Sequence, residues 1–176
     1  YLDLGAEEFD DRADAIGLAA IKLYILKPNP STTVHFDPQA SLQPNGDTGV
    51  YALYTYARIQ SICRKEGGGL EGLGGSEREE AMAALGTDLE LSLLRLLQAW
   101  PDVVRTAAAS HEPSKIVTFV IQLCRAFSTL NNDRDDHFIK EMESPRKEGL
   151  VLLLQAVGHA LCAALTLLGI KPLEQM

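Results

Sequence analysis

The sequence predicts an all-α fold, an antiparallel helical bundle of five or six helices. Apolar residues recur at intervals of three and four in five segments, which is the pattern of helices with one buried face. Proline, glycine and asparagine lie between these segments, where helices end. The 176 residues, 46% of them hydrophobic and 23% charged, fit one soluble globular domain or one domain with an appendage.

The first helix is expected over Glu7–Leu26, with Pro28 and Pro30 closing its pattern. Its buried face is predicted from apolar residues at helical spacing: Ile16, Ala19, Ala20, Leu23 and Leu26. The stretch 27–47 is expected to be a long ordered loop, with at most a brief strand or turn around Val34–Phe36. Loops of this length in compact domains are often functional.

A second helix is expected to start after the turn at Asn45–Thr48 and to run to about Lys65. Asp47 or Thr48 can accept hydrogen bonds from its first free backbone amides. A glycine-rich loop at 66–76 then breaks the helix. This loop has neither a preceding strand nor a Lys-Ser/Thr ending, so it is predicted to be a flexible linker or surface loop and not a phosphate cradle.

The third helix is expected to begin near Thr87, which can form a capping box with Glu90. Its buried stripe is predicted to contain Leu89, Leu93, Leu96 and Trp100. Pro101 is expected to end or kink this helix, although the helical pattern continues to Ala107.

The next helix is expected to open at Pro113 and to stop at Asn131-Asn132. Its inward face is predicted to contain Ile116, Phe119, Val120, Leu123, Phe127 and Leu130. The acidic run 133–136 that follows is predicted to be a solvated loop and not a metal site, because it lacks the turn residues of a calcium loop.

The last helix, 149–170, contains no charged residue and is long enough to cross a bilayer. Four polar residues fall on one narrow stripe of this region: Glu148, Gln155, His159 and Thr166. A lipid-facing span would gain nothing from such a stripe, so a buried core helix is favoured over a membrane anchor. His159 is then expected to be a residue of the polar seam rather than a metal ligand or a base.

The three cysteines, Cys63, Cys124 and Cys162, lie within apolar helical patterns and lack metal-ligand spacing. Free cysteine in such a setting behaves as a small hydrophobic residue. This usage predicts a reduced, intracellular protein, and we expect it to be cytoplasmic.

The formal net charge of −8, taken alone, argues against a nucleic-acid partner, because phosphates require clustered Lys and Arg. Most of the acidic residues, however, fall in the segments Asp3–Asp14, Glu66–Glu90 and Asp133–Glu148. Binding depends on the charge of the local face rather than on the sum, so a nucleic-acid partner stays open.

One stripe of the second helix carries residues suited to unpaired nucleotides: Tyr51, Tyr54, Arg58 and Lys65. Its apolar face lies elsewhere on the same helix: Ala52, Tyr56, Ile59 and Cys63. Tyrosine rings can stack on bases while the cations meet phosphates. The alternative is that both tyrosines pack against another helix and that Arg58 is an ordinary surface charge. The chain offers no catalytic triad, carboxylate pair or nucleotide loop that would make it an enzyme by itself.

Four parts of the chain resemble arginyl-tRNA synthetases, in the order in which they occur in that family. The run Gly46–Ile62 resembles the signature that joins the catalytic and anticodon-binding domains, and Asp14–Lys22 resembles the stretch after the second nucleotide-binding signature. Trp100–Val104 together with His111–Pro113 is similar to the middle helices, and Leu167–Met176 to the C-terminus.

The resemblance implies a class I ligase that uses ATP, with Mg, to attach L-arginine to tRNA-Arg. Both nucleotide signatures would precede residue 1, so it places no catalytic residue, metal or cofactor in this chain. It implies that 1–45 ends the catalytic domain or forms a linker and that 46–176 is the anticodon-binding bundle. The implied partners are the anticodon loop of tRNA-Arg and the protein's own catalytic domain, in a monomer without membrane contact.

The residues that the resemblance assigns to tRNA binding are Gly46, Asp47, Thr48, Tyr51, Tyr54, Arg58 and Met176.

Four positions depart from the family pattern. Val50 stands where the family often has proline, and Leu53 stands where it often has glutamine. Asn131 stands where an aromatic residue of the family helps to bind the anticodon, and Gly149 stands where an arginine is common. These changes, together with the acidic charge, support an alternative hypothesis. In it the chain is a divergent helical protein-interaction module that keeps the synthetase fold but has lost tRNA binding.

Overall fold

A computed structural model of the chain describes residues 6–133 and 139–176. Within these ranges it contains seven α-helices, two short 3-10 helices (η) and no strand, so the predicted all-α fold is confirmed. The elements are, in chain order, α1 Ala6–Leu26, α2 Pro38–Ser41, α3 Gly49–Glu66, η1 Gly67–Gly72, α4 Gly75–Ala83, α5 Asp88–Ser110, α6 Ser114–Asn132, η2 Ile139–Glu141 and α7 Arg146–Leu167.

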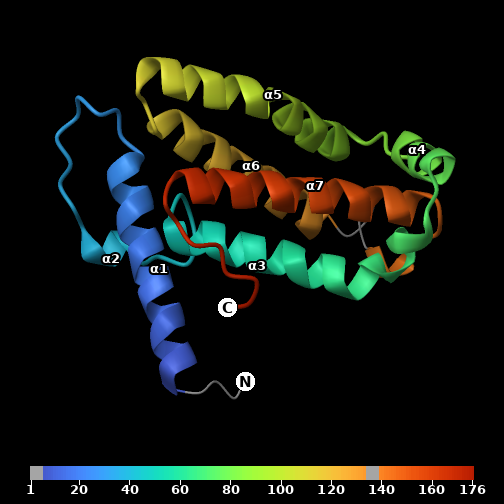
Figure 1. Cartoon of the computed structure of the whole chain (residues 1–176), viewed down its shortest axis with the longest axis horizontal. Coiled ribbons are helices and arrows are strands. Elements are labelled where there is room, and N and C mark those ends of the chain that lie inside the picture. Colours follow the sequence, from blue (N-terminus) through green and yellow to red (C-terminus); the bar gives the residue numbers. More distant parts are fainter. Residues whose placement is uncertain (1–5, 134–138) are drawn as a thin grey trace.

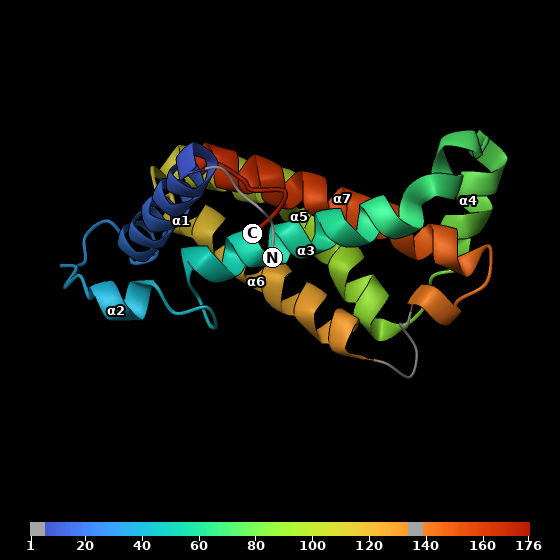
Figure 2. The same cartoon turned by 90° about the horizontal axis from the view of Figure 1, so that it is seen from below.

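Four long helices, α3, α5, α6 and α7, lie lengthwise in the bundle and alternate in direction along the chain (Figure 1). Helix α1 crosses one end of this bundle beside α2, and the short helix α4 lies at the opposite end. The view from below places α3 on the near side of these four helices (Figure 2). The five long helices correspond to the predicted ones, whereas α2 and α4 lie in segments that were expected to be loop or were not assigned.

Helix α7 is the central helix, and it packs against α3, α4, α5 and α6. Its fully buried side chains include Leu150, Leu153, Leu154, Leu161 and Leu165. In the part of the chain that the structure describes, α7 alone has the length and composition to cross a membrane, and 56% of that stretch is buried inside the bundle. The polar seam lies at the helix surface, where Gln155 is half-buried and His159 and Thr166 are exposed.

The first turn of α3 lies directly against the backbone of α1. Gly49 is buried, and a Cβ at this position would lie 2.1 Å from the carbonyl oxygen of Ala19. No side chain fits there unless the two helices move apart. The same two helices share one hydrophobic core, in which Ala19 and Leu23 belong to the cluster that contains Leu53. The division of the chain at 45/46 stays a prediction.

Helix α4 approaches α7 just as closely at the other end of the bundle. A Cβ on Gly149 would lie 2.0 Å from the carbonyl oxygen of Ala81. Gly149, where the resemblance led us to expect an arginine, therefore occupies a place with no room for a side chain.

Helix α5 starts as predicted, with Thr87 as its N-cap and Glu90 completing the capping box. Pro101 does not end the helix, which continues to Ser110. The residue before the proline, Trp100, stacks on Phe119 of α6 with ring centroids 4.7 Å apart. This packing holds the two helices together at the point where proline removes a backbone hydrogen bond.

The predictions for α6 are confirmed, since Pro113 is its N-cap residue and the helix ends at Asn132. Its predicted inward residues are buried, except that Ile116 is half-buried against the core. The glycine-rich segment, predicted to be a flexible linker or surface loop, is largely helical. It forms η1, which buries Leu70, and α4 begins at Gly75. The acidic run predicted as a solvated loop lies, from 134 onward, outside the described residues.

A buried carboxylate joins the starts of α5 and α7. Glu90 accepts hydrogen bonds from the backbone N–H groups of Gly86 and Thr87, at 2.8 and 2.9 Å, and from Arg146 at 3.2 Å. Burial alone would raise the pKa of Glu90, but these hydrogen bonds hold it below its ordinary value of 4.5. The ionised form is therefore the form that stabilises the fold.

We expect Gly49→Ala to destabilise the protein by about 1–3 kcal/mol, because its methyl group would overlap the α1 backbone. Gly17→Ala is the matched control within α1, since nothing lies within 4 Å of its Cβ position. It should raise the free energy of unfolding by up to about 1 kcal/mol, as alanine favours helix. Urea unfolding of both variants checks this, and equal effects would contradict the packing at Gly49.

We expect Glu90→Gln to lower the free energy of unfolding by about 1–2 kcal/mol near neutral pH. The folded-state pKa of Glu90 is depressed, so its contribution is present above the ordinary pKa and is lost as pH falls through the folded value. The difference between wild type and variant should therefore shrink on acidification. Asp88→Asn, at an exposed position of the same helix turn, is the control. A difference that is independent of pH would contradict the assignment.

Candidate nucleic-acid interface

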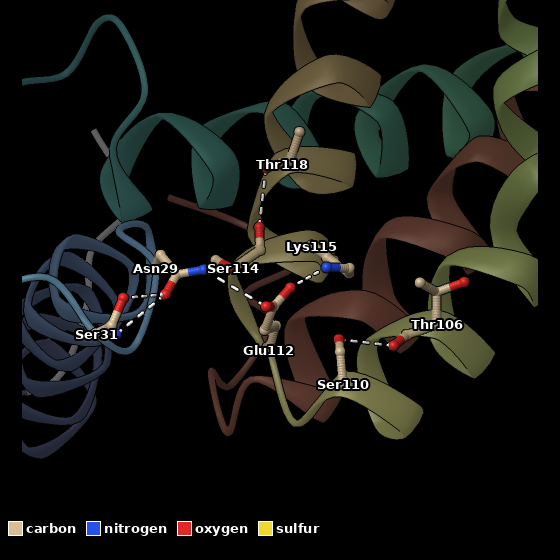
Figure 3. Close-up of polar contacts among 8 residues, drawn as sticks. All are labelled: Asn29, Ser31, Thr106, Ser110, Glu112, Ser114, Lys115 and Thr118. Carbon is tan, nitrogen blue, oxygen red and sulfur yellow. Dashed lines mark hydrogen bonds and ion pairs between the residues drawn. The ribbon is translucent and has the colours of Figure 1, made fainter.

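The long loop between α1 and α3 is fixed to the bundle by polar and aromatic contacts. The Tyr24 hydroxyl donates to the carbonyl oxygen of His35 at 3.1 Å, and the Tyr24 ring meets Phe36 edge to face at 5.3 Å. Near the start of the loop, the Asn29 side-chain amide donates to the carboxylate of Glu112 in the turn between α5 and α6 (Figure 3). Glu112 is itself paired with Lys115. The loop thus has a defined position relative to α3.

Asp47 holds two cations from different parts of the fold. Its carboxylate pairs with Lys27 at 3.2 Å and with Arg125 of α6 at 2.5 Å. Burial tends to raise the pKa of Asp47, but the hydrogen bonds and charges of these two cations keep it below its ordinary value. This residue, predicted to bind tRNA, ties the loop to the end of α1 and to α6.

The residues on either side of Asp47 shape the turn into α3. Gly46 has a φ of 84°, a conformation that glycine adopts without strain. The Thr48 hydroxyl accepts from the backbone N–H of Tyr51 at 3.1 Å and donates to the carbonyl of Gln43 at 2.7 Å. Of the two candidate N-cap residues, Asp47 and Thr48, it is Thr48 that caps α3. Asp47 and Thr48 also line a hollow of about 560 Å³ together with Tyr24, Lys27 and His35, among others.

The predicted stripe of α3 divides into one packed residue and several exposed ones. Tyr51 is half-buried and packs on the hydrophobic core, as the alternative interpretation expected of it. Tyr54 is 49% exposed, and Arg58 and Lys65 are also exposed. The Arg58 guanidinium donates to the Tyr54 hydroxyl at 3.4 Å. The apolar face predicted elsewhere on the same helix is buried, with Cys63 half-buried at its end.

The exposed part of the stripe lines a groove closed by the last residues of the chain. This α3 groove has a volume of about 400 Å³, and its lining residues are Tyr54, Ala57, Arg58, Ser61, Arg64, Glu174, Gln175 and Met176. Three predicted site residues, Tyr54, Arg58 and Met176, therefore meet in one place. Gly46, Asp47, Thr48 and Tyr51 do not line it.

Sequence reasoning missed Ser61, Arg64 and Glu174 as lining residues of the α3 groove. Ser61 and Arg64 follow Tyr54 at intervals of seven and ten, so a wider helical stripe would have included them. Glu174 lies opposite them only because the chain end folds back, with its carboxylate 3.7 Å from the Arg64 guanidinium. Asn131, the position of the missing aromatic residue, is half-buried at the end of α6 and does not line the groove.

The lining of the α3 groove combines an aromatic ring with cationic groups. It presents one exposed aromatic ring beside two guanidinium groups, with one carboxylate in the lining. Aromatic rings stack on unpaired bases, and guanidinium groups bind phosphates in a fixed geometry. Among residues 6–133 and 139–176 there is no group of three or more His, Cys, Asp and Glu that could hold a metal ion.

The chain is similar to one family of proteins. The model of the DALR anticodon binding domain family matches residues 52–176. The chain is 35% identical over 175 residues to an arginine–tRNA ligase of Streptococcus pneumoniae, covering 97% of this chain and 28% of the relative. It is 32% identical over 164 residues to an arginine–tRNA ligase of Flavobacterium psychrophilum, covering 92% and 25%. The chain thus spans about a quarter of the length of these relatives.

Solved structures share the same arrangement of helices. Arginyl-tRNA synthetase from Thermus thermophilus superposes with a TM-score of 0.84 at 26% sequence identity, covering 99% of this chain and 28% of that one. The enzyme from Plasmodium falciparum gives a TM-score of 0.82 at 23% identity, covering 96% and 28%, which is a likeness of fold.

Proposed function

Because the chain belongs to the family of DALR anticodon binding domains, we propose that it is the C-terminal anticodon-binding part of an arginine–tRNA ligase. Its α3 groove holds the anticodon loop of tRNA-Arg while the remainder of the full-length enzyme attaches L-arginine. The observation that carries this proposal is the meeting of Tyr54, Arg58 and Met176 in one groove. Tyr54 and Arg58 are neighbours on α3, whereas Met176 is more than a hundred residues away in the sequence and reaches them only through folding.

The groove has the right components for an anticodon loop. The bases of such a loop are unpaired, so they can stack on an exposed ring such as Tyr54. Arg58 and Arg64 supply positive charge at the same place. The acidic helix α4, with Glu77, Glu79 and Glu80, lies at the end of the bundle away from α1 and α2 (Figure 1). A net charge of −8 is thus compatible with a local site for RNA.

Gly46, Asp47 and Thr48 contribute to this site by shaping it. They set the position of the loop and the start of α3. The hollow that Asp47 and Thr48 line with Lys27 and His35 offers a second surface for the same RNA loop. Tyr51 fixes the rotation of α3 by packing on the core. All four remain proposed tRNA-binding residues, with this indirect role as the one that their contacts support.

ATP and Mg belong to the part of the enzyme outside this chain. The described residues do not fit them, because they hold no metal-binding cluster and the glycine-rich segment forms η1 instead of a phosphate-binding turn after a strand. We also propose that the full-length enzyme is a cytoplasmic monomer. The alternative of a helical interaction module without tRNA binding is not favoured, since the relatives compared above are arginine–tRNA ligases.

We expect Tyr54→Ala in the full-length enzyme to lower kcat/KM for charging tRNA-Arg by about tenfold or more, because one base loses its stacking partner. Tyr54→Phe keeps the ring and should retain most of the activity. Arg58→Gln should also weaken charging, with a smaller salt dependence of tRNA binding. Steady-state charging assays measure these effects.

Arg95→Gln is the charge-matched control for Arg58→Gln, because Arg95 is exposed on α5 and does not line the groove. Equal losses at Arg58 and Arg95 would indicate a diffuse charge effect. Unchanged charging by both Tyr54→Ala and Arg58→Gln would rule out this groove as the anticodon site.

A further inference from the structure

The last residues of the chain are anchored by two different means. Apolar burial holds the chain after α7, where Leu168, Ile170 and Leu173 are buried. Beyond Leu173 the side chains of Glu174, Gln175 and Met176 are exposed, so burial no longer fixes them. These three residues nevertheless form one wall of the α3 groove. Something other than the hydrophobic core must hold that wall in place.

Cations from two helices bind the backbone of this terminal segment. Lys22 of α1 donates to the carbonyl oxygen of Gly169, at the turn that ends α7. Arg64 of α3 donates to the carbonyl oxygen of Glu174 at 3.3 Å, and Arg12 of α1 donates to that of Gln175 at 3.4 Å. Hydrogen bonds from charged donors are stronger than neutral ones. Two of the three contacts come from α1, which does not line the groove.

The Arg12 side chain is also held by a contact within α1. It is only 19% exposed, and its guanidinium pairs with Glu8 one turn earlier, at 2.7 Å. The pair fixes the Arg12 side chain along α1, so little rotamer freedom is lost when it binds the Gln175 carbonyl. The position of α1 relative to α3 is fixed in turn by the contact at Gly49.

We propose that Arg12 and Lys22 are positioning residues that hold the terminal wall of the α3 groove. This inference rests on the proposed function of that groove in binding the anticodon loop of tRNA-Arg. The two residues bind no RNA themselves. They place Met176 opposite Tyr54 and Arg58, and so make anticodon binding depend on the placement of α1, outside the segment 46–176 that contains the groove.

A double-mutant cycle in the full-length enzyme tests whether Arg12 and Lys22 act through the terminal wall. Three variants are compared with wild type. The first carries Arg12→Gln with Lys22→Gln, the second lacks residues 174–176, and the third combines both changes. The equilibrium Kd for tRNA-Arg is measured at one low salt concentration. The two substitutions should raise Kd by about tenfold in the intact chain, because a displaced terminal wall loses its contacts with the RNA. They should change Kd by less than about twofold in the truncated chain, because the wall is already gone.

Two further variants separate positioning from charge and from folding. Arg95→Gln with Arg105→Gln removes the same charge from α5 and should leave Kd within about twofold of wild type. Arg12→Lys with Lys22→Arg keeps both charges and should restore most of the affinity. Thermal unfolding of each variant confirms that the compared proteins are folded.

The proposal is overturned if the Arg12 and Lys22 changes raise Kd equally in the intact and truncated chains, since that would indicate direct contact with RNA. It is also overturned if they leave Kd of the intact chain unchanged, or if truncation has no effect. Failure of the proposed function is read separately, from a Kd that does not respond to Tyr54→Ala.

Discussion

The contact on which the rest of the site depends is the approach of α1 to the first turn of α3. At Gly49 the two backbones come so close that a single methyl group would lie 2.1 Å from the Ala19 carbonyl oxygen. This contact sets the direction of α3, and with it the positions of Tyr54 and Arg58. The same helix α1 carries the cations that bind the terminal segment. One packing contact therefore governs both walls of the groove.

Most of the fold could be predicted from the sequence because its long helices have strong apolar periodicity and clear end signals. Thr87 with Glu90, and Pro113, marked helix starts that the structure confirms. Helix α4 could not be predicted in this way, because it is short and buries only Ala81. Its position depends on Gly149, whose missing side chain admits the α4 backbone. Pro101 left two outcomes open, an end or a kink, and the helix continues through it to Ser110.

The candidate site was only partly predictable. Spacing along one helix was enough to bring Tyr54 and Arg58 together, and the family resemblance added Met176. The pairing of Asp47 with Lys27 and Arg125 joins three segments, and no local pattern reports such a contact. Glu174 was missed for the same reason, because it meets Arg64 only through the folding back of the chain end.

We infer that the α3 groove binds the anticodon loop of tRNA-Arg. A photo-crosslink from a modified anticodon base to the full-length enzyme, with the linked peptides identified by mass spectrometry, tests it most directly. We expect crosslinks to peptides that contain Tyr54, Arg58 or residues 174–176, and we expect them to disappear when unlabelled tRNA-Arg competes. Specific crosslinks confined to other faces, such as α4 or α5, would contradict it.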